Sequence, residues 1–213
     1  MELLMTGITF FQKGGIVMYV LLLCSLFVFS IGIERAMYFR RMDSGRTFAR
    51  DFYLALANNK WQKAEQLADH ARGALADILF AVITKKPEAR KNPSAYMEIQ
   101  SGIALAKLRK RLYYLSVIVT MAPLLGLLGT ISGMITSFSV FNLESGQPTA
   151  ITGGVGEALI ATAMGLCVAI ISLTVHAYFS QRIENVVTDM EQCFSMVETA
   201  AVERDGMNKE EAA

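Results

Sequence analysis

Some stretches of this 213-residue chain carry no Asp, Glu, Lys or Arg, and three of the polar side chains in or beside them are candidates for chemistry. Thr130 lies within residues 112–143, Thr162 lies within residues 158–181, and Glu157 directly precedes the second stretch. An ionisable group in a bilayer costs on the order of 2–3.5 kcal/mol near mid-helix and less near an interface, so it normally faces protein or water. Hydroxyl and carboxyl groups in such places are suited to bind a cation and pass it on.

The same side chains have simpler explanations, which the sequence leaves open. Thr130 and Thr162 can bond to carbonyl groups of the preceding helical turn. Glu157 can lie at the membrane interface, where the N-terminus of a helix favours a negative charge. His176 can relay a proton, because histidine titrates near neutral pH, or it can be an interfacial side chain near Tyr178.

Small residues recur at intervals of three or four along both stretches, which places them on one face of each helix. Helices in lipid associate through close packing and interhelical hydrogen bonds, and small side chains let the backbones approach. Helix packing alone can explain the pattern, and a polar path beside it is the second interpretation. The predicted packing face consists of Gly126, Gly129, Gly133, Ala158, Ala161, Gly165 and Ala169.

The composition favours a membrane protein, because 53% of the residues are hydrophobic and only 18% are charged. A membrane-spanning helix needs about 20 largely apolar residues, and residues 14–33, 112–143 and 158–181 each supply them. Residues 35–111 hold 16 of the 20 Lys and Arg residues, whereas 142–156 hold none. By the positive-inside rule the first segment is cytoplasmic and the second is periplasmic.

We therefore predict an all-α membrane protein with three transmembrane helices, a periplasmic N-terminus and a cytoplasmic C-terminus. Long helical extensions are expected on the cytoplasmic side. The predicted segments are an outer interfacial segment (1–13), transmembrane helix 1 (14–38), a cytoplasmic helical region (39–111), transmembrane helix 2 (112–141), a periplasmic loop (142–154), transmembrane helix 3 (155–181) and a cytoplasmic helix and tail (182–213).

The charged middle of the chain reads as short helices rather than strands. Asn92 followed by Pro93 predicts an N-cap and the first position of a new helix. Without a strong breaker before Pro123, one helix is expected over 93–141, roughly 70 Å long at 1.5 Å per residue. Glu34 and Arg35 are interpreted as boundary residues whose charged ends reach toward water.

Several functional classes lack support in the sequence. Three widely spaced cysteines predict neither a disulfide framework nor a zinc site. We predict no metal site, cofactor or enzymatic activity, because no Gly-x-Ser-x-Gly elbow, His-rich cluster or phosphate-binding loop occurs. The absence of a basic tract argues against a nucleic-acid partner.

Two sequence blocks resemble the MotA/TolQ/ExbB proton channel family. The first is APLLGLLGTISGMI, residues 122–135, and the second is GEALIATAMGL, residues 156–166. Three spans fit the ExbB/TolQ branch, whereas the MotA branch has four. One departure from the family's pattern is Ala169-Ile170-Ile171, where members often have Ala-Ile-Pro, so a proline kink in the lower third helix is not expected.

The resemblance implies a channel-forming subunit of an inner-membrane motor driven by the proton motive force. It implies a homopentamer around a single-span partner of ExbD or TolR type with a membrane aspartate, which energises a TonB- or TolA-like protein. Thr130, Thr162 and Glu157 then belong to the proton pathway in a lipid-embedded assembly. The alternative from another class is a passive membrane scaffold that conducts no ion, and sodium remains conceivable as the coupling ion.

Overall fold

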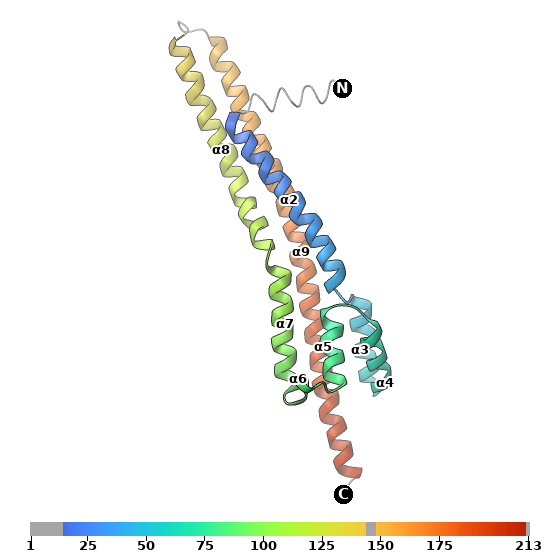
Figure 1. Cartoon of the computed structure of the whole chain (residues 1–213). Helices are drawn as coiled ribbons and strands as arrows, with labels where there is room; N and C mark the ends of the chain where they lie inside the picture. Colours follow the sequence, from blue (N-terminus) through green and yellow to red (C-terminus); the bar gives the residue numbers. More distant parts are fainter. Residues whose placement is uncertain (1–14, 144–147, 212–213) are drawn as a thin grey trace. The chain divides into compact units, whose positions relative to one another are not determined.

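The structure is a computed structural model that describes residues 15–143 and 148–211. Within these ranges, side chains are described for all but residues 90, 140–143, 148–153, 157 and 204–211. The described chain folds into α-helices, and three of its helical segments are long and apolar enough to cross a membrane (Figure 1). The prediction of an all-α membrane fold with three spans is confirmed. The expected interfacial segment 1–13 lies outside the described residues.

The chain divides into two compact units, and the first contains the apolar segments. Its described part runs from Gly15 to Glu34 and, with residues 144–147 left out, from Arg111 to Tyr178. It comprises the first part of α2 (Gly15–Met42), all of α8 (Leu112–Leu143) and the first part of α9 (Pro148–Glu211). The three helices share a core made of Leu21, Val28, Ile31, Leu115, Ile118, Ala122, Val168 and Ala169.

Helix α9 begins earlier than the sequence suggested. The prediction placed a loop over residues 142–154, on the strength of its glycines and Pro148, whereas the helical backbone begins at Pro148. The helix that was expected to start at residue 155 therefore already includes residues 148–154.

The second unit contains the end of α2, five shorter helices and the rest of α9. The shorter helices are α3 (Arg46–Ala57), α4 (Trp61–His70), α5 (Ala74–Ile83), α6 (Pro87–Arg90) and α7 (Pro93–Arg109). Its core includes the fully buried Phe52, Leu79, Met97 and Cys193. The prediction of short helices in this region is confirmed. The predicted start of α7 is confirmed too, because Asn92 Oδ1 accepts a hydrogen bond from the Ala95 N–H at 3.1 Å.

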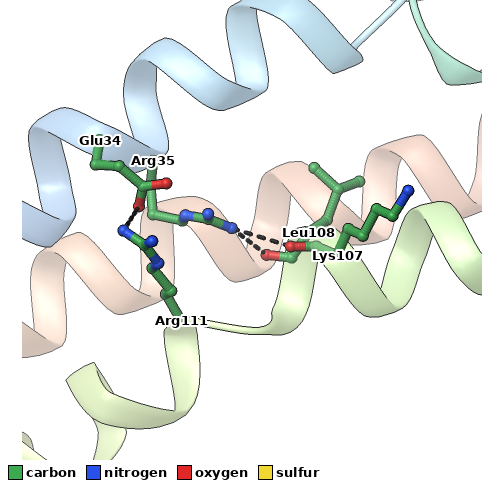
Figure 2. A network of polar contacts seen from close by, with 5 residues as sticks. All are labelled: Glu34, Arg35, Lys107, Leu108 and Arg111. Atoms are coloured by element: carbon green, nitrogen blue, oxygen red, sulfur yellow. Dashed lines mark hydrogen bonds and ion pairs between the residues drawn. The ribbon is translucent and has the colours of Figure 1, made fainter.

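The prediction of one helix over 93–141 is wrong, because a turn at Lys110–Arg111 separates α7 from α8. The last carbonyls of an α-helix have no partner within the helix. Arg35 Nη1 donates to the Lys107 and Leu108 carbonyl oxygens at 3.1 and 3.2 Å, which stabilises this end of α7 (Figure 2).

The interpretation of Arg35 as a residue reaching for water is also wrong, because only 4% of it is exposed. Its guanidinium finds hydrogen-bond acceptors inside the protein and stacks over the Tyr38 ring, 4.7 Å from the centroid. Its neighbour Glu34 belongs to the first unit and forms an ion pair with Arg111 at 2.9 Å (Figure 2).

Candidate functional site

The candidate site lies where α8 and α9 pack against each other in the first unit. Glycines make this approach possible, because a Cβ atom at these positions would crowd the facing helix. At Gly126 that atom would lie 3.0 Å from the Thr162 Cα, and at Gly165 it would lie 2.5 Å from the Ala122 carbonyl oxygen. Both neighbours are backbone atoms that cannot swing away, so the two backbones touch here.

The contact continues toward the end of α8 that leads to Leu143. A Cβ atom at Gly129 would lie 2.6 Å from the Ala161 Cβ, and one at Gly133 would lie 3.1 Å from the Ala158 Cβ. Ala169 is buried in the core that the three helices share. The structure therefore places the small residues singled out in the sequence within the packed interior of this unit.

Thr162 faces α8 across this contact. Its hydroxyl donates to the Gly126 carbonyl oxygen at 3.1 Å, between two helices whose bonded residues lie 36 positions apart in sequence. Thr130 behaves differently, because its hydroxyl donates at 2.7 Å to the Leu127 carbonyl oxygen in the preceding turn of its own helix. Both threonine side chains are half-buried.

A hydroxyl group offers one donor and two acceptor lone pairs. In Thr130 and Thr162 the donor is already directed at a backbone carbonyl. What remains on each oxygen is acceptor capacity only. These positions can therefore bind a group that donates a proton or carries positive charge.

A second hydroxyl joins the two helices at a position that the small-residue pattern of α9 includes. Ser172 is fully buried, and its Oγ donates to the Leu115 carbonyl oxygen at 3.0 Å. The signal that points to it is its spacing, because Ser172 lies three residues after Ala169 on the small-residue face of α9. Periodicity places a serine on this face but does not indicate which carbonyl it meets.

The remaining predicted residues are placed as follows. Glu157 lies within helix α9, but its side chain is outside the described part of the structure. His176 is half-buried on the same helix. Among the described residues, no group of three or more His, Cys, Asp or Glu side chains could hold a metal ion.

The chain is similar to known proteins over a region that contains these residues. The sequence profile of the MotA/TolQ/ExbB proton channel family matches residues 66–192. The biopolymer transport protein ExbB-like 1 of Synechocystis sp. is 35% identical over 170 residues, which cover 78% of this chain and 67% of that protein. ExbB-like 3 of the same organism is 32% identical over 166 residues, covering 76% and 79%. The Tol-Pal system protein TolQ of Pseudomonas aeruginosa is 33% identical over 107 residues, 45% of each chain.

Proposed function

Because the chain belongs to the MotA/TolQ/ExbB proton channel family, we propose that it is the channel-forming subunit of an inner-membrane motor driven by the proton motive force. The motor energises a periplasm-spanning protein of TonB or TolA type, for outer-membrane transport or envelope maintenance. The chain assembles as a homopentamer around a single-span partner of ExbD or TolR type that carries a membrane aspartate.

The proposed topology follows the distribution of charge. The N-terminus is periplasmic, the three apolar helices cross the inner membrane, and the second unit with the C-terminus lies in the cytoplasm. The concentration of Lys and Arg in residues 35–111 supports this orientation, because such residues accumulate on the cytoplasmic side.

The observation that carries the proposal is a pair of half-buried threonine hydroxyls in two of the apolar helices, Thr130 on α8 and Thr162 on α9, whose donors are already used. Thr162 donates to the Gly126 carbonyl and Thr130 to the Leu127 carbonyl, so only their acceptor lone pairs remain to line a path. Such a lining favours hydronium, or the protonated form of a partner carboxyl, over an anion. Glu157 adds an acid at the outer part of α9, where it attracts protons entering from the periplasm.

The membrane potential supplies the work. Each proton that moves down the membrane potential releases about 2.3 kcal/mol of free energy per 100 mV, and a pH gradient adds to this. Protonation of the partner's aspartate removes its charge and lowers the cost of moving past apolar side chains. Repeated protonation and release then drive stepwise movement of the partner helices within the ring.

Proton flux into vesicles tests the proposal directly. The chain and its single-span partner are reconstituted with a pH-sensitive dye inside, and a potassium diffusion potential is applied. The wild-type complex should acidify the lumen when the interior is negative. Thr130→Val and Thr162→Val should lose flux while the complex still assembles, whereas Thr130→Ser and Thr162→Ser should retain much of it.

The chain offers matched controls on the same helices. Thr120 in α8 and Thr174 in α9 are exposed threonines whose hydroxyls donate to carbonyls of the preceding turn, from Val117 and Ile170. Thr120→Val and Thr174→Val should leave flux unchanged. Equal flux from wild type and from the Thr130 and Thr162 variants would rule out the proposed lining.

A passive membrane scaffold is the second candidate, and one observation favours it. The Thr162 hydroxyl already joins α8 to α9, so helix packing alone accounts for its presence. A scaffold predicts that vesicles stay ion-tight under voltage, with both subunits present and every carboxylate intact. It also predicts that the chain carrying both Glu157→Gln and Thr162→Val assembles and functions as the wild type does.

The same vesicles distinguish the coupling ion. A proton path should give equal flux in sodium-free and sodium-containing buffer. A sodium path should give dye signals that disappear without sodium and uptake of radioactive sodium under voltage.

A further inference from the structure

A groove with two arginines on its wall runs between α3 and α9 in the second unit. Arg46, Arg50 and Tyr53 line it from α3, and Thr188 and Gln192 line it from α9. Their α3 positions are spaced by four and three residues, so they share one face of the helix. We call this surface the basic groove.

Other charged groups near the basic groove leave its arginines able to bind more. Asp189 also lines the groove, where its charge interacts with that of Arg46, and Arg50 makes an exposed ion pair with Asp51 at 3.6 Å. Arg46 donates to Asn185 Oδ1 at 3.2 Å. Since a guanidinium carries five N–H donors, both arginines keep donors for a further acceptor.

A second groove runs between α7 and α9, and the charged residues that line it are all glutamates. Its exposed wall carries Glu98, Glu191 and Glu198, and no Lys or Arg is among its described lining residues. Its floor is apolar, with half-buried Val187 and Phe194. We call this surface the acidic groove.

The two grooves lie on different sides of one helix. Successive residues in an α-helix turn by about 100°, so Gln192 of the basic groove and Glu191 of the acidic groove point in different directions. A single copy therefore cannot bring its own arginines and glutamates together across α9. The two surfaces remain available to different neighbours.

We propose that the basic groove of one copy of this chain binds the acidic groove of the next copy. Arg46 and Arg50 meet the glutamates of the neighbour, and Tyr53, which is 42% exposed, packs on the apolar floor. This inference rests on the proposed function in one respect: it takes from it that copies of the chain form a ring, and it names the surfaces that hold neighbouring copies together.

The charges fit the symmetry of the proposed ring. A two-fold contact pairs a surface with itself, which would bring glutamates against glutamates or arginines against arginines. A head-to-tail contact brings opposite charges together, and it closes into a ring when the rotation between copies allows. Complementary charges of this kind chiefly set the partner and the register, and salt weakens them.

Charge exchange tests the interface in the full-length chain purified in detergent. Arg46→Glu with Arg50→Glu should shift the mass measured by light scattering from the oligomer toward the single chain. Adding Glu191→Arg and Glu198→Arg to the same chain should restore the oligomer. Lys63→Glu, an exposed reversal on α4 outside both grooves, is the matched control and should change nothing. An unchanged mass for the first variant, or no recovery in the exchanged chain, overturns the proposal.

Cross-linking gives a readout that does not depend on the reversed variants folding. Gln192→Cys and Ser101→Cys are placed on separate, differently tagged chains in which Cys24, Cys167 and Cys193 are replaced by Ala. A bifunctional maleimide should join the two kinds of chain when they are co-expressed, and neither kind to itself. Self-cross-linking of either chain, or no cross-link in a mixed oligomer, overturns the head-to-tail contact.

Failure of this interface and failure of the proposed function give different results. If the interface is absent but wild-type vesicles conduct protons, the ring is held elsewhere and the motor proposal stands. If cross-linking succeeds and the vesicles stay ion-tight, the interface stands and the channel does not.

Discussion

The guanidinium of Arg35 hydrogen-bonds the Leu108 carbonyl oxygen at 3.2 Å, joining α2 to the last turn of α7. The same Nη1 also donates to the Lys107 carbonyl oxygen. A positive side chain at the C-terminal end of a helix both satisfies the last carbonyls and complements the helix dipole. Arg35 therefore stabilises the end of α7 at the turn that divides the long helix expected from the sequence.

Replacing Arg35 should destabilise the second unit. The side chain in Arg35→Gln is too short to donate to both carbonyls, one buried and one half-buried, and each unsatisfied buried polar group costs about 1–3 kcal/mol. Arg35→Lys should cost less, because an ammonium can still bond one of the two carbonyls. Thermal unfolding in detergent, followed by circular dichroism, should rank the melting temperatures as wild type, Arg35→Lys, Arg35→Gln.

Arg40→Gln provides the control for that series, since Arg40 is an exposed arginine on the same helix. It should melt with the wild type. A melting temperature for Arg35→Gln equal to that of Arg40→Gln would show that the carbonyl contacts contribute nothing to stability.

A methyl group added at Gly165 should separate α8 from α9. Its Cβ would lie 2.5 Å from the Ala122 carbonyl oxygen and 3.0 Å from the Gly126 Cα. Forcing atoms into a packed interior typically costs 1–3 kcal/mol, so Gly165→Ala should lower the melting temperature. Gly156→Ala on the same helix meets no atom within 4 Å and should be neutral or stabilising, because alanine favours helix by up to about 1 kcal/mol. Equal melting temperatures would contradict the close approach.

The helices themselves could be predicted because their signals are local. Charge-free runs of sufficient length define the three spans, and Asn92-Pro93 defines the start of α7 by its own capping chemistry. The small-residue face of α8 and α9 is also local, since its period of three to four residues places its members on one side of a helix.

The parts that sequence reasoning missed depend on partners distant in the chain. Arg35 follows an apolar run and looks like a boundary residue, but its acceptors are more than 70 residues away. The break at Lys110–Arg111 contains neither Gly nor Pro, so no local breaker marks it. Likewise, the threonines were visible as polar residues in apolar helices, but only the fold shows that Thr162 donates to the neighbouring helix whereas Thr130 donates within its own.

The two hydroxyl contacts between α8 and α9 should contribute to stability independently. Ser172→Ala removes the bond to Leu115, and Thr162→Val removes the bond to Gly126. Interhelical hydrogen bonds in membrane proteins average about 0.6 kcal/mol with a maximum near 1.7, so each loss should lie in that range. Because the sites lie ten residues apart on α9, the double variant should show the sum of both effects.

The unfolding free energies of the two single variants and the double variant are measured in mixed micelles with increasing SDS. Thr174→Val is the control, since its hydroxyl bonds only within its own helix, and it should change the unfolding free energy least. A strongly non-additive double variant would show that the two bonds form as one cooperative unit rather than as separate contacts.

Cys193 should resist alkylation across a wide pH range. Its side chain is fully buried, its Sγ donates to the Ala49 carbonyl oxygen at 3.5 Å, and burial together with the charge of Asp189 raises the pKa of the thiol to about 12 from the ordinary 9.0. Only the thiolate reacts with iodoacetamide. In a chain with Cys24→Ala and Cys167→Ala, native protein should stay unlabelled from pH 8 to pH 10, whereas SDS-unfolded protein should label readily.

The same shift fixes how Cys193 affects stability. The unfolded thiol ionises near pH 9 and the folded one only near pH 12, so the unfolded state alone gains thiolate in between. The contribution of Cys193 is therefore complete below pH 9 and is lost as pH rises toward 12. Relative to Cys193→Ala, the wild type should lose stability between these values. Parallel stability profiles for the two proteins, or native labelling that rises between pH 8 and pH 10 as it does for an exposed thiol, would contradict the buried, hydrogen-bonded state of Cys193.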